Sequence, residues 1–250
     1  MRTDWRRLAV SLAASVSLLV AAMMLYPGGD KFDADSVGYR FWHTFICDLL
    51  EAETPGAHQN EVGAILTVAA MAILTIGGLL QLWWDPPGPP ATAAALKVSR
   101  ISGVACCLFT LLVCVEVALR LSISHELITL LAGASGLLAS IAPFVGVLRA
   151  PSAPALVKVT GLAVIVAVLV NLAYYGQIAW AGEPLPPELA ATQKCALLLI
   201  VIWLAQLAMA LRGGDLSGGP SRPGAPSTPD RWSTIKSAKP RAEPPTRPGD

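Results

Sequence analysis

Charged residues are scarce in this chain. They make up 14% of its 250 residues, whereas hydrophobic residues make up 54%, and the mean hydropathy is +0.58. A typical soluble domain contains about 25% charged residues. The composition therefore excludes an ordinary soluble protein and predicts an integral membrane protein.

Short catalytic and metal-binding motifs are also missing. The sequence contains no H-E-x-x-H or C-x-x-C ligand pair, no G-x-S-x-G nucleophile turn and no Walker-type phosphate loop. The five cysteines do not predict a disulfide framework, because Cys106 and Cys107 are adjacent within one apolar run, where thiols behave as small hydrophobic groups. Cys47 and Cys195 are expected near the outer side of the membrane, so a bridge between them stays open.

Six apolar runs are long enough to cross about 30 Å of hydrocarbon. They cover residues 8–25, 62–84, 101–119, 127–148, 159–181 and 195–211. With their short connectors they predict an all-α membrane domain, a bundle of six transmembrane helices that spans residues 1–212. The first run is longer than the roughly 7–15 apolar residues of a signal peptide. We therefore expect it to be retained as a helix, with a cleaved signal peptide as the alternative.

Residues 213–250 differ from the rest in composition. Gly, Pro and Ser supply 19 of these 38 residues, and such a segment cannot bury enough apolar surface to offset its ordering entropy. We expect a disordered cytoplasmic tail. Its six basic and four acidic residues give a charge too small to favour nucleic acid, although weak attraction to an anionic membrane surface is consistent with it.

Lysine and arginine are unevenly distributed between the two sides of the predicted bundle. With the N-terminus inside and the tail left out, the inner segments carry Arg2, Arg6, Arg7, Lys97, Arg100, Arg149, Lys158 and Arg212, and the outer segments carry Lys31, Arg40, Arg120 and Lys194. Cytoplasmic segments of membrane proteins are enriched in these residues. The pattern predicts a multi-pass protein of the plasma (inner) membrane with both termini in the cytoplasm.

Residues 39–52 form an amphipathic pattern in the long first outer loop. At 100° per residue, the apolar side chains fall on one half of a helix and the polar ones on the other. The pattern predicts an interfacial helix of about four turns, whose apolar side lies in the headgroup region. Its polar side would face water, or it would close over Glu116 and Asn171 as a lid.

Reactive side chains gather on the predicted outer side, which holds all three histidines. A metal-dependent membrane hydrolase would use His43, Asp48, His58 and Glu116. A zinc site would take its ligands from His43, Cys47, His58 and His125. We predict no resident cofactor, with zinc as the alternative.

Polar residues within and beside the spans suggest ligand contacts. A carboxylate at membrane depth, such as Glu116, is a functional candidate, although Arg120 lies four residues on and offers an ion pair. Asn171 would form an interhelical hydrogen bond. The candidate ligand-binding residues are Glu51, Asn60, Glu116, His125, Asn171 and Tyr174.

Aromatic and small residues predict how the helices are anchored and packed. Trp83 and Trp84 end the second span, where membrane-interface aromatics belong. Small residues recur at every fourth position in two spans, a spacing that lets helix backbones approach closely. They are Ser99, Gly103 and Cys107 in the third span and Ala132, Gly136 and Ser140 in the fourth.

The first outer loop also carries a short motif. An aromatic-rich stretch runs into Cys47-Asp48-Leu49, and Asn60 stands just before the second span. In this arrangement the chain, from about residue 8 to residue 211, resembles a family of uncharacterised bacterial six-span membrane proteins, the domain-of-unknown-function 998 family. That family commonly has Ser where this chain has Cys47. The resemblance implies a six-helix fold and membrane residence, and it implies no particular reaction.

Together these observations predict a non-enzymatic membrane protein that binds a lipid, a small ligand or a partner protein at its outer face. Membrane lipids, a second copy of the chain or another membrane protein are the expected partners. The metal-dependent hydrolase is the alternative function. A small transporter comes third, because the sequence shows no inverted repeat.

Overall fold

The computed structural model describes residues 4–89, 92–119, 124–181, 185–214 and 216. Within these residues six helical segments are long and apolar enough to cross a membrane. They are Trp5–Leu25, Glu61–Trp84, Ala93–Val117, His125–Arg149, Ala155–Ala181 and Pro187–Gly213. The predicted all-α bundle of six spans is therefore confirmed. Of the predicted tail, all but residues 213, 214 and 216 lie outside the described part, and Leu216 is buried.

Four spans are built around one long helix each, α1 (Trp5–Leu25), α4 (Ala93–Leu119), α5 (His125–Arg149) and α7 (Pro187–Gly213). The second span consists of α2 (Glu61–Ala72), the π-helix η2 (Ile73–Leu79) and α3 (Leu80–Trp84). The fifth consists of α6 (Ala155–Gly176) and the π-helix η3 (Gln177–Ala181). A single 3₁₀ turn, η1 (Cys47–Leu50), lies in the first loop.

Two helices begin about two turns before the predicted starts of their spans. Lys97 and Arg100 interrupt the apolar run ahead of residue 101, and Lys194 does so ahead of residue 195. Helix formation does not stop at these charges, because Lys97 and Arg100 are exposed at the helix end and Lys194 is accommodated inside the bundle. The extra turns of α7 bring Lys194 into the protein interior.

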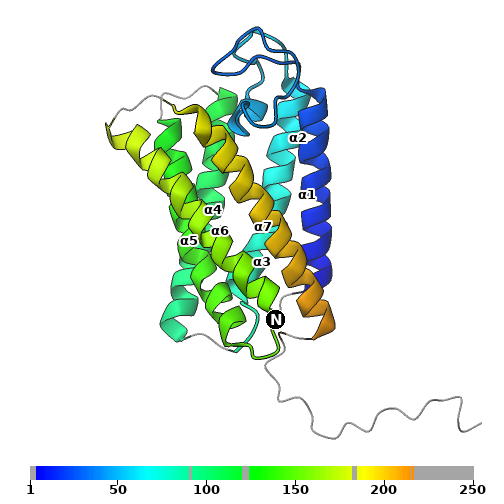
Figure 1. Ribbon diagram of the computed structural model, residues 1–250, viewed down its shortest axis with the longest axis vertical. Coiled ribbons are helices and arrows are strands. Elements are labelled where there is room, and N and C mark those ends of the chain that lie inside the picture. Colours follow the sequence, from blue (N-terminus) through cyan, green and yellow to red (C-terminus); the bar gives the residue numbers. More distant parts are fainter. Residues whose placement is uncertain (1–3, 90–91, 120–123, 182–184, 215, 217–250) are drawn as a thin grey trace, which may run out of the picture. The chain divides into compact units, whose positions relative to one another are not determined.

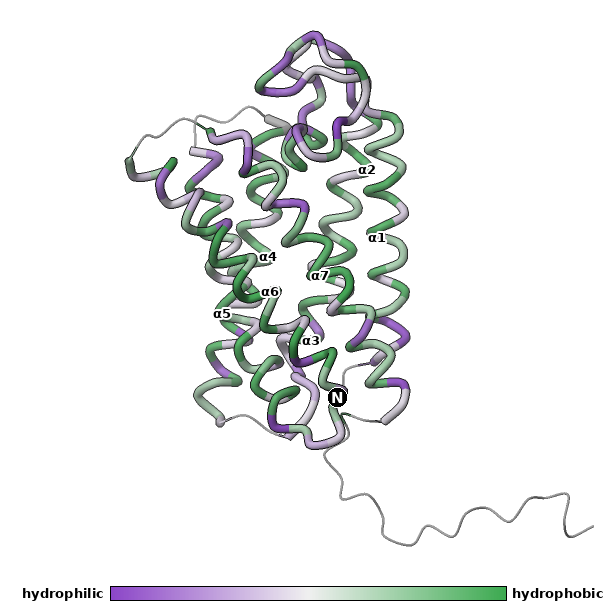
Figure 2. Tube along the Cα trace, viewed as in Figure 1, coloured by the Kyte–Doolittle hydropathy of each residue, from purple (hydrophilic) through white to green (hydrophobic). Residues whose placement is uncertain are grey.

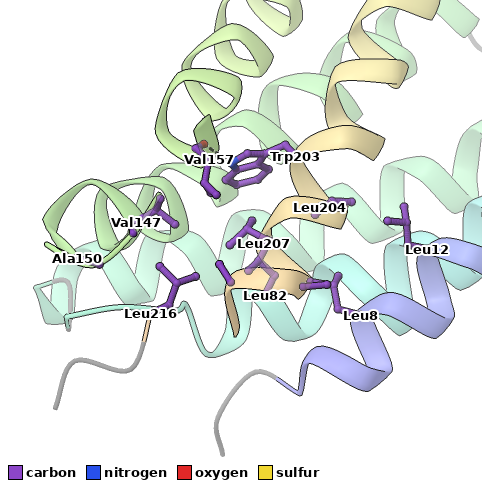
Figure 3. Packing of buried hydrophobic residues seen from close by; sticks show 13 residues of the cluster. Leu8, Leu12, Leu82, Val147, Ala150, Val157, Trp203, Leu204, Leu207 and Leu216 are labelled. Atoms are coloured by element: carbon purple, nitrogen blue, oxygen red, sulfur yellow. Dashed lines mark hydrogen bonds between the residues drawn. The ribbon is translucent and has the colours of Figure 1, made fainter. Parts of the chain in front are cut away.

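The helices run side by side, and α7 returns to contact α1 (Figure 1). Hydrophobic residues dominate their central parts, whereas hydrophilic residues gather in the first loop (Figure 2). The largest apolar cluster lies at the end of the bundle opposite this loop (Figure 3). It joins Leu8 and Leu12 of α1, Leu82 of α3 and Leu204 and Leu207 of α7. This cluster locks the first and last helices together.

Trp83 is buried in the bundle, so it does not serve as the interfacial anchor that the sequence predicted. Its indole Nε1 donates to Ser140 Oγ on α5 at 3.2 Å, and its ring lies against Gly103 of α4, where an added Cβ would come within 2.8 Å of the ring. The small residues of α4 and α5 therefore make room for a tryptophan. Trp84 is 52% exposed and lies under the Arg100 guanidinium at 5.3 Å, as expected of an interfacial aromatic.

The π-helix η2 contacts α1. A Cβ on Gly77 would come within 2.7 Å of Ser11 Oγ on α1. Gly77 therefore lies close against α1, and a larger residue there would require the Ser11 side chain to move.

The predicted interfacial helix over residues 39–52 is wrong, since only Cys47–Leu50 form a helical turn. The apolar side chains of this segment enter the end of the bundle instead of the lipid boundary. Phe45 packs on Leu130, Tyr175 and Leu189, and Leu50 packs in a second cluster between α4 and α5. The Phe45 and Ile46 N–H groups donate to side chains, not to preceding carbonyls, so the helical hydrogen-bond ladder is not formed.

The rest of loop 26–60 is braced by its own turns and one ion-pair cluster. Gly28 pairs with Val37 in an isolated β-bridge, and its φ of +121° is one that L side chains rarely adopt. Arg40 donates to Asp30 Oδ2 at 2.6 Å and to Asp33 Oδ2 at 2.9 Å. Burial of Asp30 favours its neutral form, but the Arg40 contact and two backbone N–H groups prevail and lower its pKa.

Candidate functional site

Ionisable side chains are buried beneath loop 26–60. Asp48 of η1 and Lys194 of α7 have no exposed surface, and Glu116 of α4 is 8% exposed. His125, the first residue of α5, lies beside Glu116. One end of the bundle thus holds two acids, a lysine and a histidine, although burying charged groups at membrane depth is costly.

Asp48 is held by the backbone of its own loop. Its Oδ2 accepts the Phe45 N–H at 2.8 Å, while its Oδ1 is buried without a hydrogen-bond partner among the described residues. Burial raises the pKa of Asp48 to about 6. The positive charge of Lys31 and the hydrogen bond from Phe45 partly oppose this rise, and the negative charge of Glu51 adds to it. The carboxylate therefore titrates close to neutral pH and keeps one acceptor open.

Lys194 reaches the same loop from α7. Its Nζ donates to the Thr44 carbonyl and lies 5.4 Å from the centre of the Tyr39 ring. Burial and the nearby charge of Asp48 raise the pKa of the Tyr39 hydroxyl, which keeps that ring neutral. No ion pair joins Lys194 to Asp48 in the part of the chain that the structure describes.

Glu116 and His125 form a close pair across the connector between α4 and α5. Glu116 Oε2 lies 2.8 Å from His125 Nδ1, and the other ring nitrogen, Nε2, is buried without a hydrogen-bond partner among the described residues. Arg120, the partner expected for Glu116 from the sequence, lies outside the described residues. The pair fixes the imidazole ring and leaves Nε2 available to a neighbour.

A small cavity of about 10 Å³ adjoins this pair, room for about one water molecule. It is lined by Lys31, Phe45, Cys47, His125, Glu126, Tyr175 and Leu185. Gln193 borders the same region and donates to the Tyr175 hydroxyl at 3.2 Å, with its amide nitrogen 4.0 Å from Cys47 Sγ. A thiol, an imidazole and a side-chain amide therefore meet at one point.

The structure divides the predicted hydrolase residues. Asp48 and Glu116 are buried at the loop-bearing end, whereas His43 and His58 are exposed on the surface of the loop. The zinc set is divided in the same way, since of its four members only Cys47 and His125 line the cavity. Among the described residues, no group of three or more His, Cys, Asp and Glu side chains is placed to hold a metal ion.

The predicted ligand-binding residues have mostly structural contacts. Asn60 donates to the carbonyls of Leu49 and Glu51 at 3.3 and 2.9 Å; it precedes α2 without capping it. Asn171 donates to the Thr192 carbonyl at 3.1 Å, so its predicted interhelical bond is confirmed. Tyr174 packs at the edge of the Phe45 cluster.

Sequence reasoning missed three residues of the site, Tyr175, Gln193 and Lys194. Tyr174 was selected in place of its buried neighbour, because periodicity does not say which of two adjacent tyrosines faces inward. Lys194 was assigned to a connector. The signal that places it in a helix is Pro187 followed by Glu188, a good helix start seven residues earlier.

Cys47 and Cys195 do not form the bridge that the sequence left open. All five cysteines are free. Cys195 is exposed on α7, while Cys47 is only partly accessible at the cavity. The two thiols thus lie in different surroundings.

Comparison with known proteins finds no matching family model, no matching curated protein and no matching solved structure. The resemblance to a bacterial six-span family therefore rests on the loop motif alone.

Proposed function

We propose that this chain is a multi-pass membrane protein that binds a small polar ligand beneath loop 26–60, without itself catalysing a reaction. The observation that carries the proposal is the full burial of Asp48 and Lys194 without an ion pair between them. A fold that needs these groups only for stability would be expected to pair them directly, since a buried unpaired charge is strongly destabilising.

A ligand placed between these groups would satisfy the open acceptor of Asp48. The small cavity beneath the loop has room for about one water molecule and is lined by neither Asp48 nor Lys194, so a ligand between these two side chains enters only when the loop lifts. At this point the loop is held by the apolar contacts of Phe45 and Leu50 and by hydrogen bonds to α7. The Ile46 N–H donates to Gln193 Oε1, and Lys194 Nζ donates to the Thr44 carbonyl.

The proposal is tested by identifying small molecules that copurify with the full chain. The protein is purified in mild detergent, and its extract is analysed by mass spectrometry alongside Asp48→Asn and His43→Gln. We expect a bound compound in the wild type and in His43→Gln, which alters an exposed residue of the same loop, and its loss in Asp48→Asn. A wild-type protein free of any stoichiometric compound contradicts the proposal.

One observation favours a second function, acyl transfer through Cys47. Cys47 and His125 line the same cavity, and Glu116 orients the imidazole, which is the arrangement of a nucleophile, a base and an orienting carboxylate. In such a reaction the thiolate would attack an ester carbonyl. The alcohol would leave with a proton from His125, giving an acyl thioester.

Alkylation of Cys47 tests this second function. In a Cys195→Ser background, iodoacetamide labels Cys47, and the labelled peptide is identified by mass spectrometry. If His125 acts as a base, His125→Gln slows labelling by about tenfold or more, whereas His43→Gln leaves the rate unchanged. Equal rates in all three proteins remove this candidate.

We also propose that the protein resides in the plasma membrane with both termini in the cytoplasm, on the Lys and Arg distribution. Membership of the bacterial six-span family is a further proposal. It is supported by the contact between the two parts of the motif, since the Asn60 amide donates to the backbone beside Asp48.

A further inference from the structure

A larger pocket lies between α1 and α7, at the end of the bundle opposite loop 26–60. Its volume is about 420 Å³, within the range of roughly 300–1,000 Å³ usual for ligand sites. It is lined by Trp5, Ala9, Leu12, Ala13, Val16, Val201, Ala205, Ala208, Met209 and Arg212. Only the two residues at its end, Trp5 and Arg212, carry polar groups. The lining suits a hydrocarbon chain.

Two arginines flank the tryptophan at the end of this groove. The guanidinium carbons of Arg6 and Arg212 lie 5.5 and 5.4 Å from the Trp5 ring centre. Both side chains are exposed, and neither makes an ion pair within the residues that the structure describes. The acid nearest to Arg6 along the chain, Asp4, accepts the Arg6 backbone N–H as the cap of α1. The rim is therefore positively charged.

We propose that this groove binds an anionic phospholipid, with one acyl chain along α1 and α7 and the phosphate between Arg6 and Arg212. The groove lies on two membrane-spanning helices. Guanidinium groups bind phosphate through charge-assisted hydrogen bonds, and a tryptophan suits the headgroup boundary. The site is remote from the buried cluster beneath the loop, and it stands whether or not that cluster binds a ligand.

The charge at the rim favours a lipid over a second copy of the chain as the occupant of the groove. A twofold pairing through the groove would bring the same surface of both copies together. Arg6 and Arg212 of one copy would then approach the same arginines of the other, and the acid beside Arg6, Asp4, is already engaged as the cap of α1. An anionic headgroup neutralises both arginines, and its acyl chain covers the alanine-rich floor.

The test is native mass spectrometry of the full chain in detergent with phosphatidylglycerol or with phosphatidylcholine of identical acyl chains. We expect the anionic lipid to be retained about tenfold or more over the neutral one, because two charge-assisted contacts are added. Equal retention of both lipids overturns the proposal, and so does a chain that binds a second copy through this groove instead of lipid.

Matched variants locate the site. The double variant Arg6→Gln/Arg212→Gln alters two exposed side chains and should lose the preference for phosphatidylglycerol. Arg100→Gln is the control, since Arg100 lies over Trp84 in a similar geometry at the same end of the bundle, 5.3 Å from the ring centre, but outside the groove lining. Retention of the preference in the double variant, or an equal loss in the control, contradicts the assignment.

A groove-filling variant tests the acyl chain separately. Ala205→Phe places a ring in the half-buried floor of the groove and should displace phosphatidylglycerol about tenfold, without removing a charge. A monodisperse elution profile shows that this variant is folded. A folded Ala205→Phe protein that binds phosphatidylglycerol as the wild type does overturns the acyl-chain placement, and the lipid comparison in the wild type tests the site without any variant.

Discussion

Asp48 illustrates how a single side chain can set the pH response of this fold. Its carboxylate has no exposed surface, and burial holds its folded pKa at about 6, above the value of about 3.9 in an unfolded chain. Between these two values the folded state binds more protons than the unfolded state does. The contribution of Asp48 to stability is therefore largest at acidic pH and is lost as the pH rises through about 6.

We expect Asp48→Asn to remove this dependence, because an amide stays neutral at every pH. The Tm of the variant minus that of the wild type should increase by a few degrees between about pH 4 and pH 7. For a chain of this size, about 1 kcal/mol of stability corresponds to roughly 2–4 °C in Tm. Unfolding is followed by intrinsic tryptophan fluorescence. Asp35→Asn, an exposed loop acid, is the control, and a constant difference for Asp48→Asn would contradict the argument.

At the scale of elements, Trp83 joins three helices. Its side chain extends from α3, donates a hydrogen bond to Ser140 on α5 and fills the space beside Gly103 on α4. Its backbone carbonyl also accepts a hydrogen bond from Ser99 Oγ at 3.0 Å. The close contact of α4 with α5 therefore depends on small residues in both helices.

Gly103→Ala should lower the Tm by several degrees. The added Cβ would lie 2.8 Å from a ring carbon of Trp83, a buried group that cannot move aside, and overpacking of this kind costs about 1–3 kcal/mol. Gly176→Ala is the matched control, since its Cβ would meet Trp180 at an ordinary 3.4 Å and alanine favours helices. The two variants should differ in sign in a thermal unfolding experiment, and a neutral Gly103→Ala would show that Trp83 can shift.

The helices could be predicted from sequence because run length and hydropathy decide them. Periodicity over residues 39–52 identified some of the buried side chains, such as Phe45 and Leu49. It also placed Trp42, which is exposed, on the apolar side, and Thr44 and Asp48, which are buried, on the polar side. It could not say that Phe45 would pack on α5 and α7 instead of lipid, since an apolar stripe does not specify its partner. The pairing of Glu116 with His125 was missed because it depends on how α4 and α5 pack against each other, which spacing along the chain does not encode.

At the scale of the whole molecule, the Lys and Arg distribution makes a prediction about orientation. A phosphatase reporter that is active only outside the cytoplasm should be active when fused after residue 57 and inactive when fused after residue 152. The reason is that the segments on the side of residue 152 carry more basic residues. The opposite pattern of activities would show that the topology is the reverse of the predicted one. The α1–α7 groove would then meet lipid headgroups in the other leaflet.

Loop 26–60 also constrains the order in which the protein assembles. The Ile46 N–H bonds Gln193 Oε1, a residue 147 positions further along the chain, and Phe45 rests on Leu189 and Ala190. During synthesis the loop leaves the ribosome well before α7 exists. Its anchors are complete only after the last helix has inserted, so closure of the loop is a late step of biogenesis. A chain stalled before residue 187 would lack the α7 side of this packing, and the Ile46 N–H would have no Gln193 acceptor.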